Sequence, residues 1–262
     1  MKSPLSVAAY QMVTGPDVGE NARKIHGAID ESARNGARLL VVPECALSGY
    51  LPAEEIDFDL LADAQEDVAR HVVEAETWLA LGTTVRQDGE CRNTVVLLSP
   101  TGQVAARYDK THLTGGDRRR YAPGDRLPVF REGDWTFGIQ ICFDMRFAEN
   151  WRILRRKGAE LVLHASNASR DSAWKVPVLE GAIRSRAADN GMFVVSANDA
   201  RTPQMMVSAI CDPDGKDLAR APVDAETIIY AELDHAAVKT DFLDRRRLDL
   251  WNRPENRELL LG

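Results

Sequence analysis

The feature that most constrains the fold is the alternation of short apolar segments with amphipathic ones along most of the chain. Residues 5–12 predict a strand, residues 21–35 carry apolar side chains at helical spacing, and residues 39–42 are a continuous apolar run. A continuous run of this kind is typical of a strand that is covered on both faces. This strand–helix–strand start predicts an α/β fold in which helices cover the strands of a sheet.

The same alternation continues through the rest of the chain, with one interruption. We expect further helices at 60–73, 147–157 and 176–190, and further strands at 78–85, 135–141, 160–165, 192–197, 206–211 and 227–233. The interruption is Ser99-Pro-Thr-Gly102, which predicts the turn of a hairpin between 92–98 and 103–108. Residues 111–131 predict a long irregular loop, and loops of that length in compact domains are usually functional.

The composition favours one domain over residues 1–262 and excludes several kinds of partner. A net charge of −7 argues against nucleic acid or an acidic membrane surface. No apolar run approaches the roughly 18 residues of a membrane span, and the N-terminus lacks a signal-peptide pattern, which predicts a cytoplasmic protein. The four cysteines and five histidines show no metal-ligand spacing, so we expect no metal or other cofactor.

The last part of the chain, residues 238–262, is charged and contains isolated apolar residues such as Phe242, Leu250 and Trp251. A tail of this kind often packs against a neighbouring subunit, although it could equally fold back on its own domain. We expect it at a subunit interface.

Three reactive side chains, Glu44, Lys110 and Cys142, each follow a predicted strand. Ligand chemistry in α/β folds collects at the carboxyl ends of strands, so a sheet could bring these three together. A cysteine at a strand-to-helix junction lies within reach of backbone N–H groups and cations, which lower its pKa. From these residues alone, Cys142 could also be a small buried hydrophobe, Glu44 a helix cap and Lys110 a surface lysine.

Three segments resemble the nitrilase superfamily, the carbon–nitrogen hydrolases, in order and with compatible spacing. They are Pro43-Glu44-Cys-Ala-Leu-Ser-Gly49-Tyr50, Tyr108-Asp-Lys110-Thr-His112-Leu113 and Gly138-Ile-Gln-Ile-Cys142-Phe-Asp144-Met-Arg146-Phe147. The resemblance covers nearly the whole chain. It implies a four-layer α-β-β-α sandwich that assembles into a homodimer or a larger even homo-oligomer.

The resemblance also implies a Glu44–Lys110–Cys142 triad. In it, Cys142 attacks a carbonyl carbon, Glu44 moves protons, and Lys110 with the backbone N–H of Phe143 stabilises the oxyanion. The family often has a second acid, most often Glu, in the loop between the lysine and the cysteine. Here that position is Asp117, which could orient Lys110 or simply cap the loop.

The residues after the cysteine, Phe143-Asp144-x-Arg146-Phe147, resemble those of small-amide hydrolases. We therefore expect a short-chain amidase that releases ammonia, with an N-carbamoyl amine hydrolase or a nitrilase as the alternatives that use the same triad. The candidates for the substrate pocket are Tyr50, His164, Asn167 and Trp174. His164 could instead be a satisfied buried histidine, and Trp174 could pack in the core.

Two further interpretations come from other classes of protein. A papain-like enzyme would pair Cys142 with His112 or His164, but this leaves Glu44 and Lys110 at strand ends without a role. A catalytically silent member of the superfamily would bind a metabolite or a partner protein instead of turning over a substrate.

Overall fold

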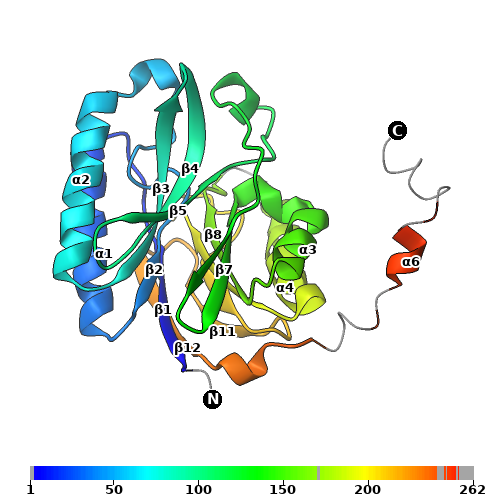
Figure 1. Cartoon of the computed structure of the whole chain (residues 1–262). Coiled ribbons are helices and arrows are strands. Elements are labelled where there is room, and N and C mark those ends of the chain that lie inside the picture. The colour runs from blue at the N-terminus through cyan, green and yellow to red at the C-terminus, as the bar shows by residue number, and fades with distance from the viewer. Residues whose placement is uncertain (1–2, 170–171, 241–244, 246, 252, 254–262) are drawn as a thin grey trace.

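The computed structural model describes residues 3–169, 172–240, 245, 247–251 and 253, and these form two facing sheets (Figure 1). The first sheet has the strand order β12-β1-β2-β3-β4-β5 and the second has the order β11-β10-β9-β8-β7-β6. The strands of the first sheet are β1 (Leu5–Gln11), β2 (Leu39–Val41), β3 (Trp78–Gln87), β4 (Glu90–Leu98), β5 (Val104–Asp109) and β12 (Thr227–Leu233). Those of the second are β6 (Val129–Glu132), β7 (Trp135–Ile141), β8 (Leu161–Ser166), β9 (Phe193–Asn198), β10 (Ala209–Cys211) and β11 (Asp217–Arg220).

Two long helices cover the outer face of each sheet (Figure 1). On the first sheet these are α1 (Val18–Arg34) and α2 (Phe58–Glu74), and on the second they are α3 (Ala148–Arg156) and α4 (Val176–Asn190). The order of layers is therefore helices, sheet, sheet, helices. The predicted α-β-β-α sandwich is confirmed.

The alternation of side chains along the strands explains why both faces of each sheet are buried. In β1, Val7 and Ala9 pack between the two sheets, whereas Ala8 packs under the outer helices. In β8, Leu163 packs between the sheets and Val162 faces the helix side. Because successive residues of a strand point to opposite faces, a continuous apolar run is what such a doubly covered strand requires.

The strand directions bring the ends of distant segments to one edge of the sandwich. β1, β2 and β3 are parallel, and so are β7, β8 and β9. β5 is antiparallel to β4, which is antiparallel to β3, so β5 runs in the same direction as β2. The segments that carry Glu44, Lys110 and Cys142 all leave the carboxyl ends of such strands.

Two strands escaped the sequence prediction, and one was predicted too long. β6 and β11 are edge strands of four residues whose side chains are mostly exposed or half-buried, so they show no apolar run. The strand predicted at 206–211 is paired only over Ala209–Cys211, since Ser208 donates its N–H to the Gln11 side chain instead of to a strand. The predicted helix at 147–157 begins one residue later, at Ala148.

Only part of the predicted tail at 238–262 lies within the described residues. Its helix α6 (Leu248–Trp251) lies apart from the sandwich in Figure 1, and its contact with a second subunit stays a prediction. Within the described ranges, no helix is long and apolar enough to cross a membrane.

Candidate active site

Glu44 is held on a tight turn that follows β2 and presses against β3. A side chain at position 82 would place its Cβ 1.9 Å from the Pro43 carbonyl oxygen, so the turn can lie this close only because residue 82 is glycine. The N–H of Leu47 donates to the Gly82 carbonyl and fixes the turn on that strand. The Glu44 carboxylate is consequently buried, with 1 % of its side chain exposed.

Lys110 follows β5 and forms the centre of a buried charge cluster. Its Nζ lies 2.6 Å from Glu44 Oε1 and 2.9 Å from Asp117 Oδ2, and its side chain is 1 % exposed. Burial by itself lowers the pKa of Lys110, but the nearby Glu44, Cys142 and Asp117 outweigh it and raise the pKa well above its usual value. Lys110 therefore stays a cation.

Asp117 takes both roles that the sequence left open. Its Oδ2 accepts hydrogen bonds from Lys110 Nζ and from the backbone N–H of Thr114, so it orients the lysine and also caps the loop. The Tyr50 hydroxyl donates to Oδ1. Burial raises the pKa of Asp117, but Lys110 and these hydrogen bonds overcome it and hold the pKa below its usual value.

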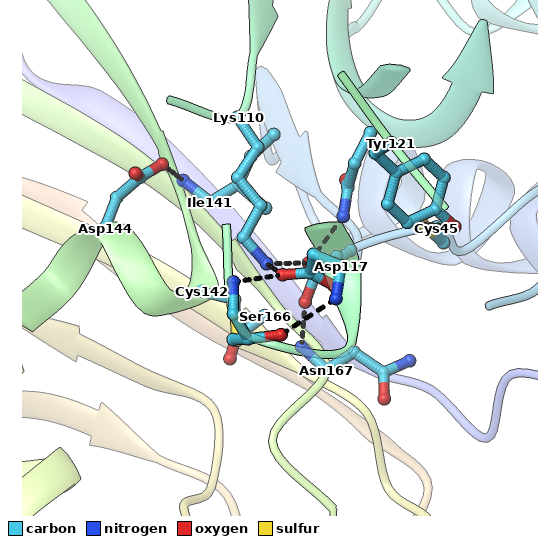
Figure 2. Close-up of polar contacts among 12 residues, drawn as sticks. Cys45, Lys110, Asp117, Tyr121, Ile141, Cys142, Asp144, Ser166 and Asn167 are labelled. Atoms are coloured by element: carbon cyan, nitrogen blue, oxygen red, sulfur yellow. Dashed lines mark hydrogen bonds and ion pairs between the residues drawn. The ribbon is translucent and has the colours of Figure 1, made fainter. Parts of the chain in front are cut away.

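Cys142 lies at a strained turn between β7 and a short 3₁₀ helix over Cys142–Arg146. Its φ of 44° is in the left-handed region, where residues other than glycine are uncommon and often functional. The first N–H groups of a helix have no acceptor within that helix, and Phe143 supplies one of them directly after the cysteine. The turn thus places a backbone N–H donor directly after the sulfur-bearing residue. Figure 2 shows the Lys110 side chain extending toward Asp117 and Cys142.

The Asp144 carboxylate fixes this turn from behind. It accepts hydrogen bonds from the Ile141 N–H at 3.0 Å, the Tyr108 hydroxyl at 2.7 Å and the His112 N–H at 2.9 Å (Figure 2 shows the first of these). The Thr111 hydroxyl adds a fourth donor at 3.1 Å. Because these donors come from β5, β7 and the loop after Lys110, the carboxylate ties the turn that carries Cys142 to the segment that carries the lysine.

The thiol of Cys142 does not have the lowered pKa that its position predicted. Burial raises its pKa to about 12 and the Glu44 carboxylate adds to the rise, whereas Lys110 and hydrogen bonds from Ser166 and Asn167 oppose it only in part. The prediction was wrong because it counted the cations and N–H donors but not the loss of solvent. A neutral resting thiol needs a base at the moment of attack.

Asn93 of β4 is a site residue that the sequence analysis missed. Its side-chain Nδ2 donates to Glu44 Oε1 at 2.6 Å, and its backbone carbonyl oxygen accepts a hydrogen bond from the backbone N–H of Lys110. It is 1 % exposed. A buried asparagine beside the apolar run Val95-Val96-Leu97-Leu98 was the available signal, since a polar side chain there needs a partner.

A cavity of about 530 Å³ is lined by Cys142 and Lys110, and two of the four candidates for the substrate pocket line it. Of these candidates, Tyr50 and Trp174 line it, and Trp174 is 72 % exposed rather than packed in the core. Phe143, which the sequence analysis gave only as a backbone donor, lines the cavity as well. Asn167 is not among the lining residues. Its backbone N–H instead donates to Glu44 Oε2 at 2.9 Å, while its side chain amide donates to Asp199.

His164 is the other pocket candidate that does not line the cavity. It is fully buried beneath the turn, with Nδ1 2.8 Å from the Ser196 hydroxyl and Nε2 3.3 Å from the Cys142 carbonyl oxygen. Burial lowers its pKa to about 4, so it is neutral and supports the backbone. It is the satisfied buried histidine of the alternative interpretation.

The papain-like pairing finds no support in this geometry. His112 Nδ1 lies 3.0 Å from Asp144 Oδ1, and the ring stacks on Phe147 with centroids 3.6 Å apart. Among the described residues, neither His112 nor His164 hydrogen bonds to the Cys142 sulfur. The same part of the chain contains no group of three or more His, Cys, Asp or Glu side chains placed to hold a metal ion.

An α-β-β-α sandwich that presents a cysteine beside a buried Glu–Lys pair has the fold and site that the resemblance implied for hydrolases of carbon–nitrogen bonds. Residues 6–241 match the sequence profile of the family described as "Carbon-nitrogen hydrolase". The chain therefore belongs to this family, and the predicted carbon–nitrogen hydrolase is confirmed.

Individual relatives agree with this assignment. The protein called "Hydrolase in pqqF 5'region" from Pseudomonas protegens is 33% identical, with 95% of this chain and 91% of that protein covered. Omega-amidase NIT2 from Homo sapiens is 29% identical, with coverages of 87% and 88%. Among solved structures, an amidase from Nesterenkonia sp. has a TM-score of 0.83 at 24% identity, with 94% of each chain covered. A mutant of that amidase carries the acetamide moiety of fluoroacetamide, covalently added at its active-site cysteine.

Proposed function

We propose that this chain is an amidase that hydrolyses a small amide through a thioester on Cys142 and releases ammonia and a carboxylate. The observation that carries the proposal is the buried contact of 2.6 Å between Lys110 and Glu44 beneath the cavity that Cys142 lines. The omega-amidase and amidase names of the relatives support an amide as the substrate.

In the first half of the reaction, Glu44 takes the thiol proton as the sulfur of Cys142 attacks the amide carbon. A neutral thiol with a raised pKa needs such a base, and the carboxylate lies in the same buried cluster. The negative charge that develops on the substrate oxygen is stabilised by Lys110 and the backbone N–H of Phe143. Glu44 then gives its proton to the leaving nitrogen, and the C–N bond breaks to leave the thioester and ammonia.

In the second half, Glu44 takes a proton from water as the water oxygen attacks the thioester carbon. The C–S bond breaks, the proton returns to the sulfur, and the carboxylate product leaves. Asn93 and the Asn167 N–H bind the two oxygens of Glu44 and hold the base in one orientation through both halves. Asp117 holds Lys110 by its second contact, so the lysine keeps its place when Glu44 becomes protonated.

The test is ammonia release from butyramide, its nitrile analogue and an N-carbamoyl amine of similar size, with Cys142→Ala as the control. Hydrolysis of the amide that is lost in the alanine variant supports the proposal. A preference for the carbamoyl amine or the nitrile would keep the triad and replace the substrate class. Equal release by the alanine variant, or no release from any of the three, would overturn the catalytic assignment and favour the silent binding module.

We also propose that the chain works as one domain in the cytoplasm, as a homodimer or a larger even homo-oligomer. The cysteines within the described residues are all free, which suits a reducing compartment. The exposed side chain of Leu250 on α6, 40% accessible, supports residues 238–262 as part of the subunit interface. Sedimentation of the full chain and of a chain ending at residue 240 tests this.

A further inference from the structure

The backbone N–H of Asn167 contacts both the proposed base and the proposed nucleophile. It donates to Glu44 Oε2 at 2.9 Å, and a hydrogen bond from the same N–H opposes the rise in the pKa of the Cys142 thiol. Among the described residues it is the only hydrogen-bond donor to Oε2, whereas Oε1 accepts from both Asn93 and Lys110. A base must lie within hydrogen-bond reach of the proton that it takes, so the position of this N–H matters to the reaction.

The side chain of Asn167 points away from Cys142 (Figure 2) and is held in a closed ring of hydrogen bonds. Its Nδ2 donates to Asp199 Oδ2 at 3.2 Å, and its Oδ1 accepts from Arg201 Nη2 at 2.8 Å. Arg201 closes the ring, because its Nε and its backbone N–H both donate to Asp199 Oδ1, at 3.0 and 2.7 Å. The donor end and the acceptor end of the Asn167 amide are thus both bound, which fixes its orientation.

Asp199 connects this ring to the core of the second sheet. Its side chain is fully buried, and it directly follows β9, whose last residue, Asn198, pairs with Ser166 of β8. The backbone N–H of Asp199 donates to the Ser166 carbonyl oxygen at 3.1 Å, and the same oxygen accepts from the backbone N–H of Glu44 at 3.4 Å. The ring therefore joins residue 167 to backbone that already contacts the segment of the base.

We propose that Asp199 and Arg201 are positioning residues that act on the reaction through Asn167. By holding the Asn167 amide, they keep its backbone N–H where Glu44 Oε2 can take the proton of the Cys142 thiol. None of the three ring residues is among the described residues that line the cavity, so the ring has no direct contact with the substrate site. This inference deepens the proposed function and rests on it.

The first test is steady-state hydrolysis of butyramide by variants of the ring. Arg201→Met removes both side-chain contacts of the guanidinium group, and Asn167→Ala removes the amide but keeps the backbone N–H. Each should lower kcat by about tenfold, because a small misplacement of a catalytic group is costly, and should change KM by less than about twofold. The double variant should be no more than about twofold slower than either single one, since both act through one ring. Losses that multiply in the double variant would overturn the ring as a unit.

Arg184→Met is the matched control. Arg184 makes a comparable pair with Asp217, at 3.0 Å from Nε to Oδ1 and 2.7 Å from Nη2 to Oδ2, and its side chain is 37% exposed against 43% for Arg201. It does not line the cavity, so its loss should leave kcat within about twofold of the native chain. Urea denaturation shows that both variants are folded. Equal falls of kcat in the two variants, or no fall in Arg201→Met, would make the ring a purely structural feature.

Alkylation of Cys142 by iodoacetamide separates this inference from the proposed amidase. The sulfur forms a bond to the methylene carbon of the reagent, iodide leaves, and the thiol proton passes to Glu44, so the step needs the base but no amide hydrolysis. Mass spectrometry of the peptide that contains Cys142 measures the rate. A rate about tenfold lower in Arg201→Met, and unchanged in Arg184→Met, supports the positioning role even if no amide is turned over. An equal rate in the native chain and Arg201→Met contradicts it.

The Glu44→Gln background shows whether the ring acts through the base. Adding Arg201→Met to Glu44→Gln should change the alkylation rate by less than about twofold, because the group through which the ring acts is already absent. A further tenfold fall in the double variant would mean that the ring affects the thiol by another route, which contradicts the inference.

Discussion

The two sheets contribute to the site in different ways. The first sheet supplies buried charge, because Glu44 follows β2, Lys110 follows β5 and Asn93 lies in β4. The second sheet supplies Cys142, the proposed nucleophile, on a backbone turn with φ of 44° that the Asp144 carboxylate holds by accepting the Ile141 N–H. The charged groups are thus held by one another and by donors from Asn93 and Asn167, whereas Cys142 is held by the conformation of its backbone turn. Substitutions in the two sheets should therefore affect activity and stability in different ways.

The largest expected effect is on the base. Glu44→Gln keeps the size of the side chain but cannot accept the thiol proton, so kcat/KM for the amide should fall by about 10²–10⁴-fold. Steady-state ammonia release measures this. Unchanged far- and near-UV circular dichroism shows that the variant is folded. Activity within threefold of the native chain would remove Glu44 from the mechanism.

The next largest effect concerns the stability of the fold, which depends on the buried cluster of Glu44, Lys110 and Asp117. Lys110→Met leaves Glu44 and Asp117 buried without their cation, which should lower the free energy of unfolding by about 3–5 kcal/mol. Urea denaturation measures the change. Lys216→Met is the control, since that side chain is 75% exposed and its contact with Asp214 is at the surface, so the change should stay within about 0.5 kcal/mol. Equal effects of the two substitutions would mean that the cluster is not held by its own charges.

Asn93→Ala should have a smaller effect that separates positioning from folding. It removes one hydrogen bond to the Glu44 carboxylate, worth about 1.5–3 kcal/mol, so kcat should fall by about tenfold or more. KM should change little, because Asn93 does not line the cavity. A fall in the free energy of unfolding with an unchanged kcat would make Asn93 a purely structural residue.

The smallest expected effect concerns the ionisation of Cys142, for which we expect no thiolate absorbance near neutral pH. Because burial raises the pKa of Cys142 in the folded state to about 12 from its usual 9.0, the folded state favours the neutral thiol. The contribution of this thiol to the free energy of unfolding is fully present below its pKa in the unfolded chain. It is lost as the pH rises from about 9 toward 12. The difference in absorbance at 240 nm between the native chain and Cys142→Ala should stay flat from pH 6 to 9. A thiolate midpoint within that range would contradict the buried neutral thiol.

The comparison between the sheets also marks what the sequence could predict. Strands covered on both faces, such as Leu39–Val41, are visible as apolar runs, and reactive residues that follow them could be placed at one edge. The short edge strand Asp217–Arg220 carries no such pattern, because its side chains are mostly exposed. The protonation state of the Cys142 thiol was the property that the sequence predicted least well. The raised pKa of Cys142 depends on burial by segments distant in sequence, which no local motif reports.

The same limit applies to the supporting residues. His164 ends up beneath the turn and Asn167 acts through its backbone, although both were expected to point into the pocket. One residue of register along β8 decides on which face a side chain lies, and a sequence cannot fix that when both faces are buried. Asn93 was missed for the related reason that its partner, Glu44, is 49 positions away.

The apolar wall of the cavity has a consequence for how this protein can change over time. Leu113, Met145, Leu179 and Met205 shape the space that a substrate fills, yet their side chains take no part in the hydrogen bonds that hold Glu44 and Lys110. Substitutions of these residues can change the preferred length or bulk of the substrate without disturbing the hydrogen bonds around Glu44 and Lys110. The residues that shape the cavity are therefore distinct from those that hold the charged centre, so we expect substitutions in the wall to change substrate preference more than the reaction itself.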